Sequence, residues 1–106
     1  MNQAAKYDVF QAIADPTRRQ VLQLLTEDGK AIAEIAAQFP ISRTAVVKHL
    51  QILEQAKLVS ATKHGREKIY TLHASKLKDV EDWLNYFNLF WDNKLTQLQH
   101  FVEQDS

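Results

Sequence analysis

Residues 41–59, which read ISRTAVVKHLQILEQAKLV, combine a surface for packing with a dense set of hydrogen-bond donors. Apolar side chains recur here at the spacing of an amphipathic helix, which predicts one buried face. The other positions hold long polar side chains and almost no carboxylate, so few acids compete with an anionic ligand. Such donors suit the base edges and phosphates of a nucleic acid. They are Ser42, Arg43, Thr44, Lys48, His49 and Gln51.

The expected roles of these side chains differ. Arg43 can read guanine through its O6 and N7 atoms, a contact worth about 1–3 kcal/mol of discrimination. Lys48 is expected to bind a phosphate, because phosphate contacts are commoner than base contacts. Ser42 caps the helix, and its hydroxyl is also a candidate for a phosphate contact. For His49, a DNA contact and a structural role at the edge of the core are both open.

A second basic group follows the donor-rich helix. After Leu58 the period of the apolar side chains changes from 3.6 to 2, which predicts strands Val59–Lys63 and Lys68–Leu72. The segment HGRE joins them, with Gly65 at the turn. The hairpin tip is basic, and we expect its side chains to contact phosphates or a minor groove. The candidates are Lys63, Arg66 and Lys68.

The distribution of charge supports a nucleic-acid partner although the net charge of the chain is zero. Residues 42–74 carry six Lys and Arg against two Asp and Glu. Residues 1–41 carry four against five, and residues 75–106 carry three against six. A basic middle segment therefore lies between two acidic flanks.

Helices and a hairpin must position these groups. Asp15 is a candidate N-cap followed by Pro16 at the first helical position, and Gly29 is expected to end that helix. Ser42 is the corresponding cap for the donor-rich helix. The predicted order is α-α-α-α-β-β-α in a single domain over residues 1–106, mainly α with a small β-hairpin. The other expected elements are helices at about 3–14, 31–38, 42–56 and 75–103 and the hairpin at about 59–72.

The composition limits the classes of protein to which the chain can belong. The chain has 106 residues, of which 45% are hydrophobic, enough for one domain with a core. It has no cysteine, which excludes disulfides and thiolate metal sites on this chain. No apolar run is long enough to cross a bilayer, and the N-terminus lacks the pattern of a secretory signal. We therefore expect a cytoplasmic protein without membrane insertion.

The order of elements indicates a winged helix-turn-helix over about residues 31–72. Two short helices joined by a tight turn, the second capped by Ser42 and polar on its outer face, fit a helix-turn-helix. The second helix of that motif lies in the major groove of double-stranded DNA. The basic hairpin fits the wing that follows it.

Three motifs in this order resemble ArsR/SmtB-type winged-helix regulators. Residues 12–25 read AIADPTRRQVLQLL, residues 41–59 look like the recognition helix of that family, and KHGREKIYTL looks like its wing. The resemblance covers about residues 8–74 and implies a homodimeric transcriptional regulator, usually a repressor. The aromatic-rich last helix is similar to that of a cysteine-free branch of the family. One departure is Lys57, where the family usually has glycine.

The last helix carries a long apolar seam. Six of the ten aromatic residues fall between Trp83 and Phe101, and apolar residues recur at steps of 4, 3, 4, 4, 3 and 4 from Val80 to Val102. We expect a two-fold dimer, which would place two recognition helices about 34 Å apart on a pseudo-palindromic operator. A monomer that folds this helix over its own core is an alternative, as is a small-molecule pocket lined by Trp83, Phe87 and Trp91. The expected dimer residues are Tyr7, Phe10, Trp83, Leu84, Phe87, Trp91, Leu95 and Leu98.

No cofactor is expected. The resemblance implies that metal sensing is common among such regulators. One type of sensor site has cysteine pairs in the third helix, which here reads KAIAEIAAQF and contains none. His100 and Glu103 form a weak candidate pair in the last helix, where the matching upstream positions hold Phe87 and Leu89. Two ligands do not make a zinc site, which needs three or four. A metal-responsive repressor is nevertheless kept as an alternative.

Other classes of function are less well supported. The chain has no glycine-rich phosphate loop and no converging acid–base pair, so we do not expect an enzyme. A winged helix that binds a protein instead of DNA is a further alternative, which steep salt dependence of DNA binding would exclude. The expected partners are double-stranded DNA and a second copy of the chain, and a protein or small-molecule effector is open.

Overall fold

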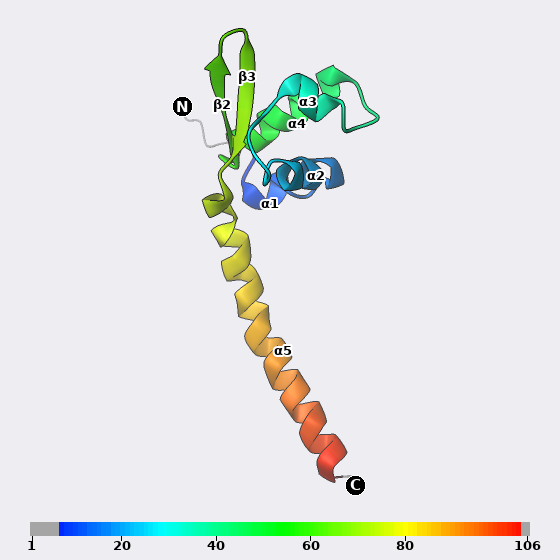
Figure 1. Ribbon diagram of the computed structural model, residues 1–106. Coiled ribbons are helices and arrows are strands. Elements are labelled where there is room, and N and C mark those ends of the chain that lie inside the picture. The colour runs from blue at the N-terminus through cyan, green and yellow to red at the C-terminus, as the bar shows by residue number, and fades with distance from the viewer. Residues whose placement is uncertain (1–6, 105–106) are drawn as a thin grey trace.

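The computed structural model describes residues 7–104. Figure 1 shows a small head of helices and a hairpin, from which the last helix projects as a long rod. The molecule measures 69 × 37 × 21 Å and has a radius of gyration of 19.3 Å, whereas a compact domain of this length has about 13 Å. The elements are α1 (Val9–Ala12), α2 (Pro16–Leu24), β1 (Lys30–Ala31), α3 (Ile32–Ala36), α4 (Arg43–Gln55), β2 (Val59–His64), β3 (Glu67–Leu72), the 3₁₀ helix η1 (Ala74–Leu77) and α5 (Lys78–Gln104).

The first helix is shorter than expected. A capping box starts α1: the Asp8 carboxylate accepts from the N–H of Gln11 at 2.7 Å, and the Gln11 side chain accepts from the N–H of Asp8 at 2.8 Å. Tyr7 therefore precedes the helix instead of lying on it. Residues 3–6 of the expected helix lie outside the described residues.

The start of α2 is as predicted, but its end is not. The Asp15 carboxylate accepts from the N–H of Arg18 at 3.0 Å, with Pro16 at the first position. The helix ends at Leu24, before Gly29. A Cβ added at Gly29 would lie 2.9 Å from Cγ2 of Ile69. This glycine permits a close approach to β3 and does not cap the helix.

A three-stranded antiparallel sheet replaces the expected two-stranded hairpin. Its order is β1-β3-β2, and Lys30 pairs with Tyr70 and Ala31 with Ile69. Two residues of β1 are too few to show a period of 2, so the sequence pattern did not predict this strand. The third helix is correspondingly shorter than the expected 31–38.

Helix α4 has well-defined caps. At its start the Ser42 hydroxyl accepts from the N–H of Ala45 at 3.1 Å. At its end Lys57 adopts a left-handed φ of 63°. Its N–H donates to the carbonyl of Glu54 at 2.9 Å, and that of Leu58 donates to the carbonyl of Leu53 at 3.0 Å. These two bonds form a Schellman motif.

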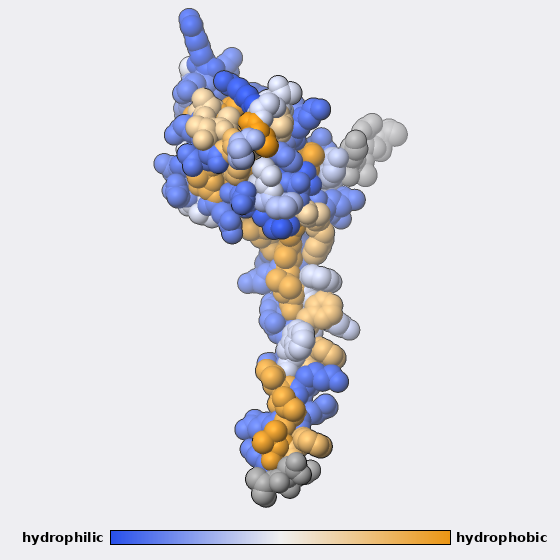
Figure 2. Space-filling model, turned by 90° about the vertical axis from the view of Figure 1, so that its right-hand side faces the viewer, coloured by the Kyte–Doolittle hydropathy of each residue, from blue (hydrophilic) through white to orange (hydrophobic). Residues whose placement is uncertain are grey.

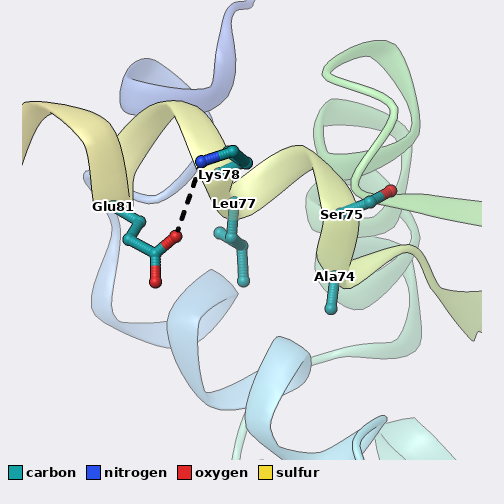
Figure 3. A pocket seen from close by; sticks show the side chains of 5 residues that line it. All are labelled: Ala74, Ser75, Leu77, Lys78 and Glu81. Atoms are coloured by element: carbon teal, nitrogen blue, oxygen red, sulfur yellow. Dashed lines mark ion pairs between the residues drawn. The ribbon is translucent and has the colours of Figure 1, made fainter.

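The core of the head joins α1–α4 to the sheet and leaves most of α5 outside. Leu77 and Val80 pack against this core. Figure 3 shows Leu77 pointing from the η1–α5 elbow toward the head, while Lys78 lies 3.9 Å from Glu81 in an exposed ion pair. Fully buried large side chains are Val21, Ile35, Val46, Leu50, Leu53, Leu58 and Val59.

Candidate nucleic-acid interface

The outer face of α4 presents a row of polar side chains. Thr44, Lys48, Gln51 and Gln55 follow one another at steps of 4, 3 and 4 and are all exposed. The opposite face buries Val46, Leu50 and Leu53 completely. The row contains no carboxylate, so it presents mainly donors to a ligand. Sequence reasoning missed Gln55, although the same period would have extended the row to it.

The start of α4 meets the hairpin in one shallow hollow. This hollow of about 170 Å³ is lined by Arg43 from α4 and by Arg66 and Lys68 from the hairpin. Residues 31–33, where β1 passes into α3, also line it, and Glu67 is the single acid of the lining. The fold thus joins the two basic groups predicted from sequence into a continuous surface.

The hairpin places like charges opposite each other. Its register pairs Lys63 with Lys68 directly across the two strands, at a cost in stability of several tenths of a kcal/mol. Gly65 has a φ of 63°, which suits the first position of a two-residue turn. Within residues 7–104, the ion pairs of the structure include neither of these lysines nor Arg66. An anion on this hairpin would relieve the repulsion.

His49 lies on the flank of α4 that faces α2. Its side chain is 21% exposed, and Nδ1 is 3.4 Å from Nη1 of Arg18. The Asp15 carboxylate is 3.9 Å away, too far for a hydrogen bond. Of the two roles left open for His49, this position favours the structural one, and its DNA contact stays an untested prediction.

Asp15 is an ionised cap in this arrangement. Partial burial by itself raises the pKa of this carboxyl. The N–H of Arg18 and the charges of His49 and Arg18 outweigh that effect and bring the pKa below its ordinary value. The carboxylate is therefore held in the form that caps α2 and balances the neighbouring cation.

The last helix exposes its apolar seam. Every side chain from Glu81 to Glu103 is exposed, and Figure 2 shows hydrophobic residues along the rod. This arrangement contradicts the alternative of a monomer that folds the helix over its own core. The head contacts the first turns of α5. There Phe10 packs edge-to-face on Trp83 with ring centroids 5.8 Å apart.

A hollow on α5 differs from the small-molecule pocket that was kept as an alternative, the one lined by Trp83, Phe87 and Trp91. That hollow of about 400 Å³ is lined by another side of the helix and shares only Phe87 with the predicted set. Its lining residues are Tyr86, Phe87, Leu89, Phe90 and Asn93.

The described part of the chain has neither a metal-binding cluster nor a membrane-spanning helix. Within it, no three His, Cys, Asp or Glu side chains cluster closely enough to hold a metal ion. Of the weak candidate pair His100 and Glu103, the latter accepts from the Gln99 amide at 3.3 Å. None of the helices described has both the length and the apolar character needed to cross a membrane.

Known proteins share both the sequence and this architecture. A family described as a helix-turn-helix domain matches residues 13–60. The transcriptional repressor SdpR of Bacillus subtilis is 40% identical over 82 residues, which cover 76% of this chain and 91% of SdpR. The regulator Rv2034 of Mycobacterium tuberculosis is 32% identical over 96 residues, covering 91% of this chain and 87% of that protein.

Solved structures agree with these relatives. The ArsR-family regulator RHA00566 superposes with a TM-score of 0.70 at 32% identity, covering 78% of this chain and 91% of that one. An ArsR-like regulator from Rhodococcus sp. RHA1 gives a TM-score of 0.72 at 31% identity, covering 91% and 88%. Together with the capped recognition helix and the basic wing, these similarities show that the chain belongs to the ArsR family of winged helix-turn-helix transcriptional regulators.

Proposed function

We propose that this protein is a homodimeric repressor that binds a pseudo-palindromic operator in double-stranded DNA. One observation carries the proposal. The carboxylate-free row on α4 continues, through the hollow that Arg43 shares with Arg66 and Lys68, into a hairpin whose charges repel one another. Such a surface attracts a polyanion and suits the phosphates of DNA.

The two parts of this surface have different tasks. The row on α4 would lie in the major groove, with Arg43, Thr44 and Gln51 toward base edges. Lys48 would bind a phosphate, as would the exposed Ser42 hydroxyl by donating its O–H, because its oxygen already accepts from the N–H of Ala45. The wing residues Lys63, Arg66 and Lys68 would bind the backbone or the adjacent minor groove.

The second copy of the chain is the proposed partner for the seam on α5. Trp91 is 59% exposed and Leu95 is 62% exposed, and an apolar face of this size usually marks an interface. With 27 residues, α5 is about 40 Å long, enough for two copies to pack side by side. The remaining proposed contacts are Tyr7, Phe10, Trp83, Leu84, Phe87 and Leu98.

Repression is the proposed outcome of binding, because SdpR, the repressor with 40% identity, is similar over most of its length. A dimer that covers an operator would exclude polymerase from an overlapping promoter. Its target lies on DNA in the cytoplasm, so we place the protein there. The similar proteins are regulators, and we propose no catalytic activity for this chain.

A fluorescence anisotropy titration tests the proposal. The probes are a labelled duplex from upstream of the gene for this protein and a scrambled duplex of the same composition, each at two salt concentrations and with or without zinc. We expect preferential binding of the upstream duplex by two protomers, a steep loss of affinity with salt, and no effect of zinc. Equal affinity for both duplexes would contradict sequence-specific binding.

A further inference from the structure

Arg18 contacts two other helices at once. From the first turn of α2, its Nε donates to the carbonyl of Ala12 at 2.6 Å, and its Nη2 donates to that of Gln11 at 3.2 Å. Its Nη1 lies 3.4 Å from Nδ1 of His49 on α4. Because a guanidinium has only donors, this contact is a hydrogen bond in the state of His49 in which Nδ1 is unprotonated. A single side chain therefore connects α1 with the recognition helix.

The position of Arg18 has an electrostatic cost. A cation in the first turn of a helix is unfavourable by a few tenths of a kcal/mol. In return, the guanidinium donates to two carbonyls at the end of α1, that of Ala12 and that of Gln11, the second of which also accepts from the N–H of Ala14. A helix of four residues is not stable alone, so bonds of this kind and the burial of Val9 and Ala12 hold it in place.

The other side of α1 contacts the last helix. The Phe10 ring packs on the edge of Trp83 at an interplanar angle of 78°. Trp83 flanks the apolar seam of α5 and in turn packs on Phe87, with ring centroids 5.1 Å apart. A continuous chain of contacts thus runs from the seam through α1 and Arg18 to α4.

We infer that Arg18, acting through His49, is a positioning residue that sets the recognition helix relative to the dimer seam. In a two-fold dimer, the position of α4 relative to the seam determines the distance between the two recognition helices. Arg18 therefore determines which spacing between operator half-sites the dimer accepts. This inference rests on the proposed function and adds a residue that does not itself touch DNA.

The test uses operators in which the spacing between half-sites is changed by one base pair. Without the contacts of Arg18 the position of each recognition helix is less well fixed. The ratio of affinities for native and altered spacing should therefore fall about tenfold in Arg18→Met. His49→Leu should do the same, and the double variant should lose no more than either single one. His49→Asn keeps an acceptor near the place of Nδ1 and should restore discrimination.

The chain supplies a matched control in Arg19. This residue donates to the carbonyl of Ile13 at 2.8 Å, also at the end of α1, but from the exposed side of α2. Arg19→Met therefore removes an equal charge and one tie to α1, and it should keep the spacing preference of the unaltered protein. Thermal unfolding checks that each variant folds. If Arg18→Met does not fold, the spacing preference of His49→Leu provides the test.

The outcomes separate this inference from the proposed function. Failure of the unaltered protein to prefer its operator would overturn both. An unaltered protein that discriminates spacing, together with an Arg18→Met variant that loses affinity equally for all spacings, would overturn the inference alone. In that case Arg18 would act only in holding the fold together.

Discussion

Replacing Lys57 by glycine should stabilise the protein. Lys57 is the C′ residue of the Schellman motif that ends α4, with a φ of 63°. A left-handed conformation costs a residue with a Cβ about 1–2 kcal/mol. Glycine avoids this cost but loses about 0.5–1 kcal/mol more conformational entropy on folding. The expected net gain is about 0.5–1 kcal/mol.

This gain should appear as a rise in the melting temperature. For a domain of this size, 1 kcal/mol corresponds to about 4–8 °C, so we expect Lys57→Gly to raise Tm by about 2–8 °C. The two hydrogen bonds of the motif involve only backbone atoms and should be retained. The affinity for DNA should not fall, because Lys57 follows the C-terminal end of α4, away from Arg43 and the hollow.

Circular dichroism melting of the dimer at fixed protein concentration is the suitable assay. Lys57→Ala is the matched control, because it removes the same charge and side chain but keeps the Cβ that causes the strain. We expect no comparable rise for this variant. An unchanged or lower Tm for Lys57→Gly, or an equal rise for Lys57→Ala, would refute the explanation by backbone conformation.

Three further predictions concern the interface, a helix cap and the dimer. Arg43→Ala should relax base preference, whereas Arg66→Ala should weaken binding to all sequences alike and reduce the dependence of affinity on salt concentration by about one unit of slope. Anisotropy titrations with variant duplexes measure both effects, and an equal change of base preference in the two variants would contradict this division of roles. The pKa of Asp15 is lower in the folded protein than in the unfolded chain. The carboxylate therefore stabilises the fold at any pH above its unfolded-state pKa, and this contribution is lost as the pH falls through its folded-state pKa. Melting between about pH 5 and pH 3 should therefore depend less on pH in Asp15→Asn, which keeps a capping oxygen; an unaltered pH profile would argue against this. Trp91→Glu places a charge on the exposed seam and should shift sedimentation to the monomer, while a dimer that persists would place the interface elsewhere.

Local signals in the sequence were enough to predict the starts of the main helices. Asp15 with Pro16 and Ser42 cap their helices through atoms three residues away, so no distant contact is needed. The hairpin followed from its period of 2 and from Gly65, to within one residue at each strand end at the turn. These features together positioned most of the candidate DNA surface.

Features that depend on tertiary contacts could not be predicted in the same way. The strand at Lys30–Ala31 exists only because β3 lies beside it, and Gly29 is required by the approach of Ile69 from the same strand. The contact between Arg18 and His49 joins residues 31 positions apart. Helical periodicity places His49 near the edge of the core, but only the packing of α2 shows which partner it meets.

A hydroxyl-radical footprint on the operator tests whether a dimer reads two half-sites with its α4 helices. We expect two protected patches per duplex, related by two-fold symmetry and separated by about one helical turn, about 10–10.5 base pairs, because two α4 helices would lie in successive major grooves. Weaker protection by the two wings should flank them. A single protected patch, or uniform protection that ignores sequence, would contradict a dimer that reads two half-sites with its recognition helices.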